Sequence, residues 1–318
     1  MHLHTNNDDF KELIIATASN TPGLQNHQVE KDYYVSLFLK ELSKLDNNVE
    51  IVFKGGTSLS KCYDVIDRFS EDIDLTIKFP NAKAGRGLRK RLKENIIVTI
   101  DKLGMKFLNP DDVQSDRDFN HYDIEFERLF ESTPEMIPHI KIETIVVYKP
   151  YPCLKKHVSN YIMKYLFELE EGSNLINKYD LETFEMSIQS IDRTFIDKLF
   201  ALCDYHLAKT YERYSRHIYD IHMIWNSGLL DKKVVADITD DVISDRQLLS
   251  DRNPSAKPGS RPIEILQEII DKQVFKSDYN EVTLGFIYKK VSYEKCIDSL
   301  KAVLENKLIP EEVKNINY

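Results

Sequence analysis

The hydrophobic positions near the N-terminus follow a helical spacing and then change to the spacing of a strand. Over residues 8–46, Val29, Tyr33 and Leu37 fall near one face, and charged residues occupy the opposite face. The short apolar run over residues 49–53 has the length and composition of a strand. The pattern therefore predicts a helical region followed by a strand.

A glycine pair follows this strand and marks a turn. Gly55-Gly56 interrupts the apolar run, and Thr57 or Ser58 is suited to cap a helix that extends to about residue 66. Residues 72–79 alternate between polar and apolar side chains and end before a proline, as a second strand would. Residues 82–103 then predict a basic helix.

Two further strands precede a long helical region. Residues 121–130 and 137–148 alternate like strands and are separated by a Ser-Thr-Pro turn. Beyond two prolines, residues 153–179 and 192–226 have mainly helical spacing, with Gly228 as a helix stop. Residues 250–260 are rich in Ser, Pro, Asn and Gly and predict an exposed loop, which further helices follow.

These elements predict an α+β fold with two domains. Residues 1–150 form a domain with a mixed sheet, and residues 151–318 form a mainly helical domain. With 42% hydrophobic and 30% charged residues, the composition is that of a soluble protein. No apolar run is long enough to cross a membrane, the N-terminus has no secretory signal, and the four cysteines are widely spaced. We therefore expect a cytoplasmic protein.

Asp72 and Asp74 are the first candidates for chemistry. Alternate side chains of a strand share a face, so both carboxylates project together while Ile73 enters the core. Two such carboxylates repel each other when ionised, and a divalent cation removes the repulsion. Carboxylates on adjacent strands often hold the cations of phosphoryl transfer. Taken alone, an Asp-x-Asp pattern is more often a solvent-facing polar stripe.

The turn before the helix is the second candidate. Glycines between a strand and a helix let backbone N–H groups and a hydroxyl approach a phosphate, and here these residues are Gly55, Gly56, Thr57 and Ser58. A simple tight turn explains the glycines equally well when they are taken alone. In the order strand, Gly-Gly-Thr turn, helix, Asp-x-Asp strand, the two motifs together favour a site for nucleotide phosphates and a cation.

Four ordered blocks of sequence extend this pattern over roughly residues 25–226. The blocks are VEKDYYV at 29–35, KGGTSL at 54–59 with RFSEDIDL at 68–75, FIDKLFAL at 195–202, and RHIYDI at 216–221. Together they resemble the AbiEii/AbiGii toxin family, whose catalytic domain is a nucleotidyltransferase of the polymerase-beta superfamily. The resemblance implies a polymerase-beta-type domain joined to a helical domain, with the active cleft between them.

The resemblance also implies a role for each matched position. The triphosphate of a nucleoside triphosphate (NTP) is held at the glycine turn, by Gly55, Gly56, Thr57 and Ser58. Asp72 and Asp74 bind Mg²⁺ or Mn²⁺. Lys198 reaches the phosphates from the helical domain, and Asp220 completes the active site. One position departs from the family pattern, because His217 stands where many members have an acidic residue.

The superfamily implies a third carboxylate on a later strand. Glu143 is the preferred candidate, since it alternates with Ile140 and Ile142 and would serve as a metal ligand or as the general base for an attacking hydroxyl. Glu125, on the preceding predicted strand, is the alternative.

Lys198 and Asp220 also have simpler interpretations. Lys198 fits a surface lysine whose stem covers apolar neighbours. Arg216 and Asp220 are four residues apart, the spacing of an exposed helical ion pair that contributes only a few tenths of a kcal/mol. The family resemblance favours the functional interpretation of both residues.

Residues 83–93 (KAGRGLRKRLK) are the most basic part of an acidic chain. The net charge of −9 argues against a protein that coats nucleic acid nonspecifically. A local basic patch that contacts the phosphates of an RNA acceptor and an ordinary solvated helix face are equally compatible with this stretch.

The resemblance implies the toxin of a bacterial toxin–antitoxin or abortive-infection system. The expected reaction transfers a nucleoside monophosphate to the end of a tRNA or another RNA, and a cognate antitoxin is the expected partner. A protein or small-molecule hydroxyl is the alternative acceptor. A third possibility is a catalytically inactive member that binds nucleotides, against which the intact Asp72/Asp74 pair argues.

Overall fold

The computed structural model describes residues 1–45, 49–80, 84–134 and 136–316. Contacts within the chain define two units. The first comprises Met1–Asp64, Phe69–Val146 and Cys153–Ile188, and the second comprises Val65–Arg68, Val147–Pro152 and Gln189–Tyr318. In the described ranges, every helix is too short or too polar to cross a membrane.

A seven-stranded mixed sheet forms the centre of the first unit, with the strand order β3-β4-β5-β2-β1-β7-β6. The strands are β1 (Ile51–Lys54), β2 (Asp72–Ile77), β3 (Lys106–Phe107), β4 (Phe119–Glu125), β5 (Ile140–Ile145), β6 (Cys153–Val158) and β7 (Phe184–Gln189). β2 runs antiparallel to β1 and parallel to β5, and β1 runs parallel to β7. This sheet with its covering helices confirms the predicted α+β class.

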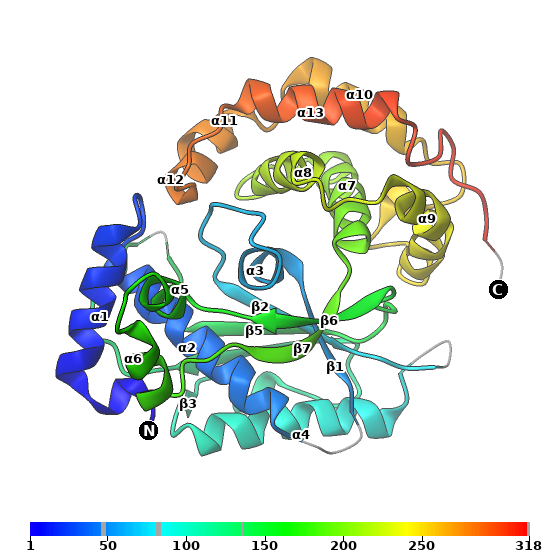
Figure 1. Cartoon of the computed structure of the whole chain (residues 1–318). Coiled ribbons are helices and arrows are strands. Elements are labelled where there is room, and N and C mark those ends of the chain that lie inside the picture. The colour runs from blue at the N-terminus through cyan, green and yellow to red at the C-terminus, as the bar shows by residue number, and fades with distance from the viewer. Residues whose placement is uncertain (46–48, 81–83, 135, 317–318) are drawn as a thin grey trace. The chain divides into compact units, whose positions relative to one another are not determined.

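Helices cover both faces of the sheet. Figure 1 shows α4 (Arg86–Lys102) below the sheet and α3 (Gly55–Lys61) above it. Ile73 of β2 and its partner Ile142 of β5 are fully buried. Since α3 packs on β1 and β2 and its first residue contacts Asp74, the polar side chains that alternate with these isoleucines face the side of α3.

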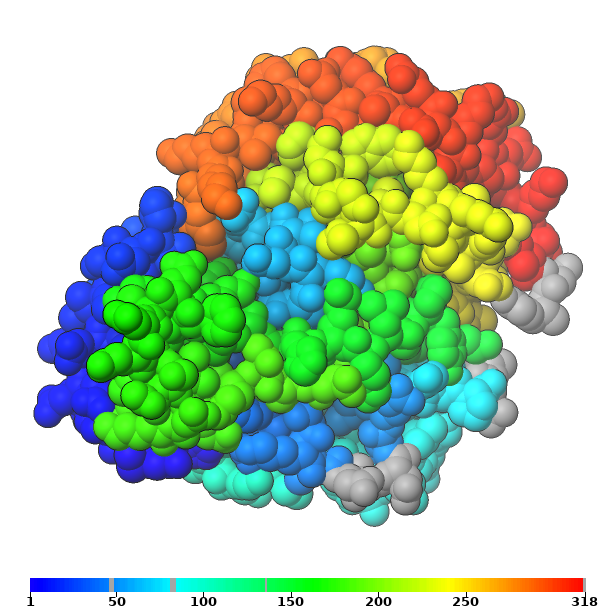
Figure 2. All heavy atoms as spheres, in the orientation of Figure 1, coloured from blue at the N-terminus to red at the C-terminus, as the bar shows by residue number. Residues whose placement is uncertain are grey.

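The predicted helical region at the N-terminus contains two helices, α1 (Asn7–Asn20) and α2 (Asn26–Ser43). A Thr-Pro-Gly sequence separates them, and Gly23 has a φ of +85°, which a continuous helix does not permit. Residue 46, the predicted end, lies outside the described residues. In Figure 2 the blue surface of α1 adjoins the green surface of α5 (Tyr161–Phe167) and α6 (Gly172–Lys178), and α1 contacts α5.

The helix after the glycine pair differs from the prediction at both ends. It begins at Gly55, with Lys54 rather than Thr57 or Ser58 in the N-cap position. It ends at Lys61 instead of near residue 66. Asp64 has a φ of +54°, a left-handed conformation that an α-helix cannot contain, so the chain turns away early.

The helical prediction for residues 153–179 is wrong over its first part. Cys153–Val158 forms β6, the edge strand next to β7, and only α5 and α6 are helical. The sheet supplies the pairing that local spacing does not reveal. Contacts assign Cys153–Ile188 to the first unit, whereas the sequence placed a domain boundary after residue 150.

The second unit is mainly helical, as predicted. Its helices are α7 (Ile191–Leu207), α8 (Arg216–Asn226), α9 (Lys232–Gln247), α10 (Pro262–Lys272), α11 (Lys276–Asp278), α12 (Leu284–Phe286) and α13 (Tyr293–Glu305). Gly228 follows α8 with a φ of +73°, which confirms it as a helix stop. The exposed loop predicted over residues 250–260 is wrong in its centre, because Ser255 and Ala256 are fully buried beside α7 and α9.

Candidate functional site

Asp72 and Asp74 lie on one face of β2, and both are half-buried. Strand β5 places Lys141 beside Asp72 and Glu143 beside Asp74 in the parallel register. Three carboxylates on two neighbouring strands therefore share the face of the sheet that α3 covers.

The glycine turn contacts the second of these carboxylates. Gly55 has a φ of +77°, and a Cβ added to it would collide with Oδ2 of Asp74. The absence of a side chain lets the first residue of α3 and the Asp74 carboxylate touch. The glycine turn and the Asp-x-Asp strand are thus in direct contact.

The hydroxyl groups that follow the glycines form bonds within the chain. Thr57 Oγ1 donates to the carbonyl oxygen of Asp72 at 2.5 Å and lies 2.9 Å from Ser70 Oγ. Ser58 Oγ donates to the carbonyl oxygen of Gly55 at 2.8 Å. Both side chains are buried. Thr57 joins α3 to the start of β2, and Ser58 stabilises the first turn of α3.

The two candidates for the third carboxylate have different surroundings. Glu143 is the direct neighbour of Asp74, and its carboxylate lies 2.5 Å from Lys141 Nζ. Glu125 belongs to β4, two strands from β2, and pairs at 3.0 Å with Lys106 of β3. Proximity to the Asp72/Asp74 pair therefore favours Glu143.

Asp123 extends this polar face and was missed by the sequence analysis. It lies opposite Lys141 on β4, and its Oδ1 is 3.2 Å from His139 Nε2. His121, in turn, lies opposite Glu143. The alternating His-Tyr-Asp-Ile-Glu pattern of β4 was the available signal, since its polar residues share one face.

Lys141 is the cation within this group of carboxylates. Burial acts against its charge, but Glu143 raises its pKa, and Asp72 and Asp123 act in the same direction. In the described part of the chain, no three His, Cys, Asp or Glu side chains are arranged to hold a metal ion. The oxygen atoms of Asp72, Asp74 and Glu143 are nevertheless the ligand type that Mg²⁺ and Mn²⁺ prefer.

A buried ion cluster lies within the second unit. Asp220 of α8 is fully buried, and its Oδ2 accepts a hydrogen bond from Lys198 Nζ of α7 at 2.6 Å. Arg68 Nε donates to Asp220 Oδ1 at 2.7 Å, and Arg68 Nη2 donates to Oδ2 at 2.8 Å. Burial by itself would raise the pKa of Asp220, but Arg68 and Lys198 lower it well below its usual value.

Both simple interpretations of the helical residues are wrong. Lys198 is only 6% exposed and is not a surface lysine. Asp220 is paired with Lys198 and Arg68 inside the unit, so it does not form an exposed pair with Arg216. His217 leaves these ion pairs intact, since neither of them involves residue 217. Arg68 is the first residue of the RFSEDIDL block, but nothing in its local pattern pointed to this ion pair.

Two basic side chains of α4 form bonds within the first unit. Arg89 Nη1 lies 2.6 Å from Asp118 Oδ1, and Lys93 Nζ donates to the carbonyl oxygen of Val113 at 2.7 Å. Lys83, the first residue of the predicted patch, lies outside the described residues. Because α4 lies on the opposite face of the sheet from α3, this patch is not adjacent to the contact between Gly55 and Asp74.

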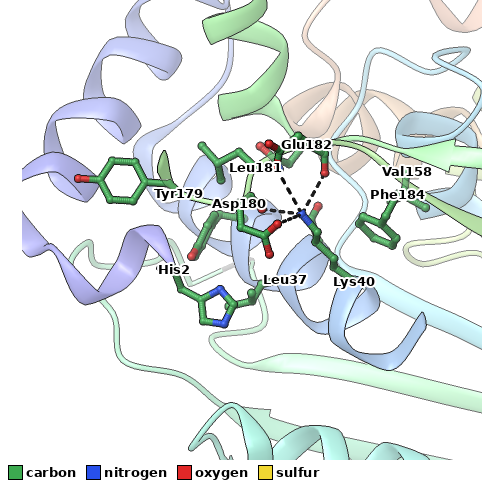
Figure 3. A pocket seen from close by; sticks show the side chains of 12 residues that line it. His2, Leu37, Lys40, Val158, Tyr179, Asp180, Leu181, Glu182 and Phe184 are labelled. Atoms are coloured by element: carbon green, nitrogen blue, oxygen red, sulfur yellow. Dashed lines mark hydrogen bonds and ion pairs between the residues drawn. The ribbon is translucent and has the colours of Figure 1, made fainter. Parts of the chain in front are cut away.

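A small pocket of the first unit is separate from these residues (Figure 3). It is lined in part by His2, Leu37, Lys40 and Asp180, and its free space of about 20 Å³ holds no more than a water molecule. Lys40 is one of the lining residues, and its Nζ donates to Asp180 Oδ1 at 2.7 Å. The pocket is therefore too small for a nucleotide.

Comparison with known proteins identifies the family. No curated protein matches the chain. Among solved structures, MenT4, a nucleotidyltransferase toxin from Mycobacterium tuberculosis H37Rv, has a similar fold, with a TM-score of 0.59, 17% sequence identity, and coverage of 93% of this chain and 88% of MenT4. The profile of the family described as "Nucleotidyl transferase AbiEii toxin, Type IV TA system" matches residues 37–306. This chain therefore belongs to the AbiEii family of nucleotidyltransferase toxins from type IV toxin–antitoxin systems.

Proposed function

We propose that this toxin transfers a nucleoside monophosphate from an NTP to the end of an RNA, with tRNA as the preferred acceptor. The observation that supports this proposal is the contact of the Asp74 carboxylate with the Gly55 turn, beside Glu143. In this reaction the acceptor hydroxyl attacks the α-phosphorus in line. A new P–O bond forms, the bond to the β-phosphate breaks, and pyrophosphate leaves.

Three carboxylates of the first unit are the proposed cation ligands. Asp72, Asp74 and Glu143 supply hard oxygen donors on adjacent strands, which fits Mg²⁺ or Mn²⁺. A bound divalent cation would neutralise the negative charge of the triphosphate and of the departing pyrophosphate. As the alternative to a role as cation ligand, we propose that Glu143, next to Asp74, accepts the proton of the attacking hydroxyl.

The remaining proposed residues bind the phosphates. Backbone N–H groups of Gly55 and Gly56 donate to the triphosphate, while Thr57 and Ser58 hold the turn in shape. Lys198 of the second unit supplies a positive charge for the phosphates. Asp220, which accepts a hydrogen bond from Lys198, holds this ammonium group in place.

The biological setting extends the family assignment. The proposed site of action is the cytoplasm, where NTPs and tRNA are available, and transfer to a tRNA end would stop translation. A cognate antitoxin is the proposed partner, as the toxin–antitoxin family implies.

Incubation with bulk tRNA, Mg²⁺ and each labelled NTP in turn tests the proposal. We expect one nucleotide to label tRNA, and we expect the Asp72→Ala/Asp74→Ala variant to label none. Label on protein or on a small molecule would instead identify the alternative acceptors. If the wild type labels nothing, with either Mg²⁺ or Mn²⁺, the proposal is wrong and the chain acts as a binding protein.

A further inference from the structure

Three consecutive charged residues near the start of α2 are buried, and the proposed function gives them no role. Glu30 is 1% exposed, Lys31 0% and Asp32 7%. Buried charges destabilise a fold unless they are paired and hydrogen-bonded. Each of the three is bonded to a different segment of the first unit, so this part of α2 acts as a junction.

Lys31 bonds to two residues that are also bonded to each other. Its Nζ donates to Glu71 Oε2 at 2.9 Å and to the carbonyl oxygen of Ile137 at 2.7 Å. The backbone N–H of Ile137 also donates to Glu71 Oε2, at 3.0 Å. Lys31, Glu71 and Ile137 thus form a closed triangle of hydrogen bonds, which we call the Lys31 triangle.

The Lys31 triangle lies where two strands of the candidate site begin. Glu71 immediately precedes Asp72, the first residue of β2. Ile137 lies three residues before Ile140, the first residue of β5. The triangle therefore ties together the starts of the two strands whose register places Asp74 beside Glu143.

Glu30 supports the same region from the adjacent position. Its Oε1 accepts a hydrogen bond from the backbone N–H of Leu129 at 2.6 Å, and its Oε2 accepts one from Phe130 at 3.2 Å. Both residues belong to the connection between β4 and β5. Two successive side chains of α2 thus anchor the segment that leads into the Glu143 strand.

We propose that Lys31 is a positioning residue for nucleotidyl transfer. It does not touch the substrate. It acts through Glu71 and Ile137 to hold the β2 and β5 carboxylates at the separation that catalysis requires. The inference rests on the proposed function of Asp72, Asp74 and Glu143. Residues that orient metal ligands in this way affect activity or metal affinity by roughly 10- to 100-fold when they are mutated.

Lys40 provides a matched control on the same helix. It is also buried, at 8% exposure, and its Nζ donates to Asp180 Oδ1 at 2.7 Å, to Asp180 O at 2.7 Å and to Glu182 O at 3.3 Å (Figure 3). These partners precede β7 and include none of the proposed cation ligands. Replacement of either lysine by methionine removes a buried ammonium and its hydrogen bonds, but only one replacement disturbs the carboxylate strands.

The experiment compares Lys31→Met, Lys40→Met and Lys31→Arg for melting temperature, kcat and KM. We expect both methionine variants to melt at lower temperature than the wild type. Lys31→Met should lose roughly 10- to 100-fold in kcat with little change in KM. Lys40→Met should keep the kcat of the wild type, and Lys31→Arg should recover part of the lost rate. Equal kcat losses in the two methionine variants, or none in Lys31→Met, would overturn the proposal.

Two additions keep the test decisive. If Lys31→Met does not fold, Glu71→Gln replaces it, because glutamine retains the size of glutamate and removes the charge that pairs with Lys31. If the wild type transfers no nucleotide, the proposed function fails, and stabilisation by Mn²⁺ alone becomes the readout. A smaller Mn²⁺ shift in Lys31→Met than in Lys40→Met then supports the positioning role. Equal shifts, or no shift in any protein, reject it.

Discussion

Two groups of charged residues, one in each unit, are built in opposite ways. On the sheet of the first unit, four half-buried carboxylates and one ammonium group lie on neighbouring strands. The carboxylates belong to Asp72, Asp74, Asp123 and Glu143, and the ammonium belongs to Lys141. In the second unit, the single carboxylate of Asp220 is fully buried between two cations, Lys198 and Arg68. One group has an excess of negative charge, and the other an excess of positive charge.

The two groups are therefore expected to differ in how much they contribute to folding. An accessible excess of negative charge favours the binding of a cation and contributes little to folding. A fully buried ion cluster destabilises the fold strongly if one partner is removed, since the other charges stay buried without compensation. Four substitutions or conditions test this contrast.

The largest effect is expected from Asp220→Asn. Loss of this carboxylate leaves Lys198 and Arg68 buried beside a neutral amide, which should lower the free energy of unfolding by about 3–5 kcal/mol. Urea denaturation followed by circular dichroism measures the change. Asp240→Asn, at an exposed position of α9, is the control and should unfold like the wild type. Equal stability of both variants would show that the buried cluster has no special role in the fold.

Asp74→Asn should affect the rate and spare the fold. We expect kcat to fall by about 10²- to 10³-fold, because charge stabilisation in the transition state is lost, with no decrease in melting temperature in cation-free buffer. Glu143→Gln should also lower kcat, whereas Glu125→Gln should leave it unchanged. A similar kcat for the Glu143 and Glu125 variants would contradict the choice of Glu143.

Gly55→Ala should have an intermediate effect that involves both fold and site. The added methyl group collides with Asp74 and requires a left-handed φ of +77°, so we expect a loss of about 1–3 kcal/mol in the free energy of unfolding. In the Asp74→Ala background the collision disappears and only the backbone strain remains. A double-mutant cycle should therefore show a smaller loss there, and strict additivity would contradict the contact.

The smallest effect is a dependence on acid pH. The folded-state pKa of Asp220 lies below its unfolded value of 3.8, so its contribution is complete above about pH 5 and is lost as the pH falls further. Between pH 5 and pH 3 this amounts to about 1 kcal/mol in the free energy of unfolding. The slope of stability against pH should be shallower in Asp220→Asn by this amount. Parallel curves for the two proteins would refute the assignment.

The sequence predicted the strands that carry the candidate residues better than the elements around them. The alternation in β2 was sufficient to place Asp72 and Asp74 on one face, and the strand that carries Glu143 was found by its own alternation. The sequence pattern did not predict which strands pair with each other. That Glu143 lies beside Asp74, while Glu125 lies two strands away, follows from the parallel register of β2 and β5, which no local pattern encodes.

The errors have a common physical origin in tertiary contacts. The local spacing of residues in β6 is compatible with a helix. The segment forms a strand because the edge of β7 is available for pairing. The polar segment around Ser255 resembles a loop, yet its backbone N–H and hydroxyl are buried against Asp204 and Phe200. The ion pair between Arg68 and Asp220 could not be predicted from local sequence, because the two residues are 152 positions apart.

Lys141 has a consequence for the folding of the sheet. Its ammonium group lies 2.5 Å from Glu143 and beside Asp72, so the carboxylate-bearing strands contain a positive charge of their own. The ammonium group of Lys141 offsets part of the repulsion between these carboxylates, so the two strands can pair without an ion from the solution. The sheet can therefore fold before it binds the cation that the proposed reaction requires.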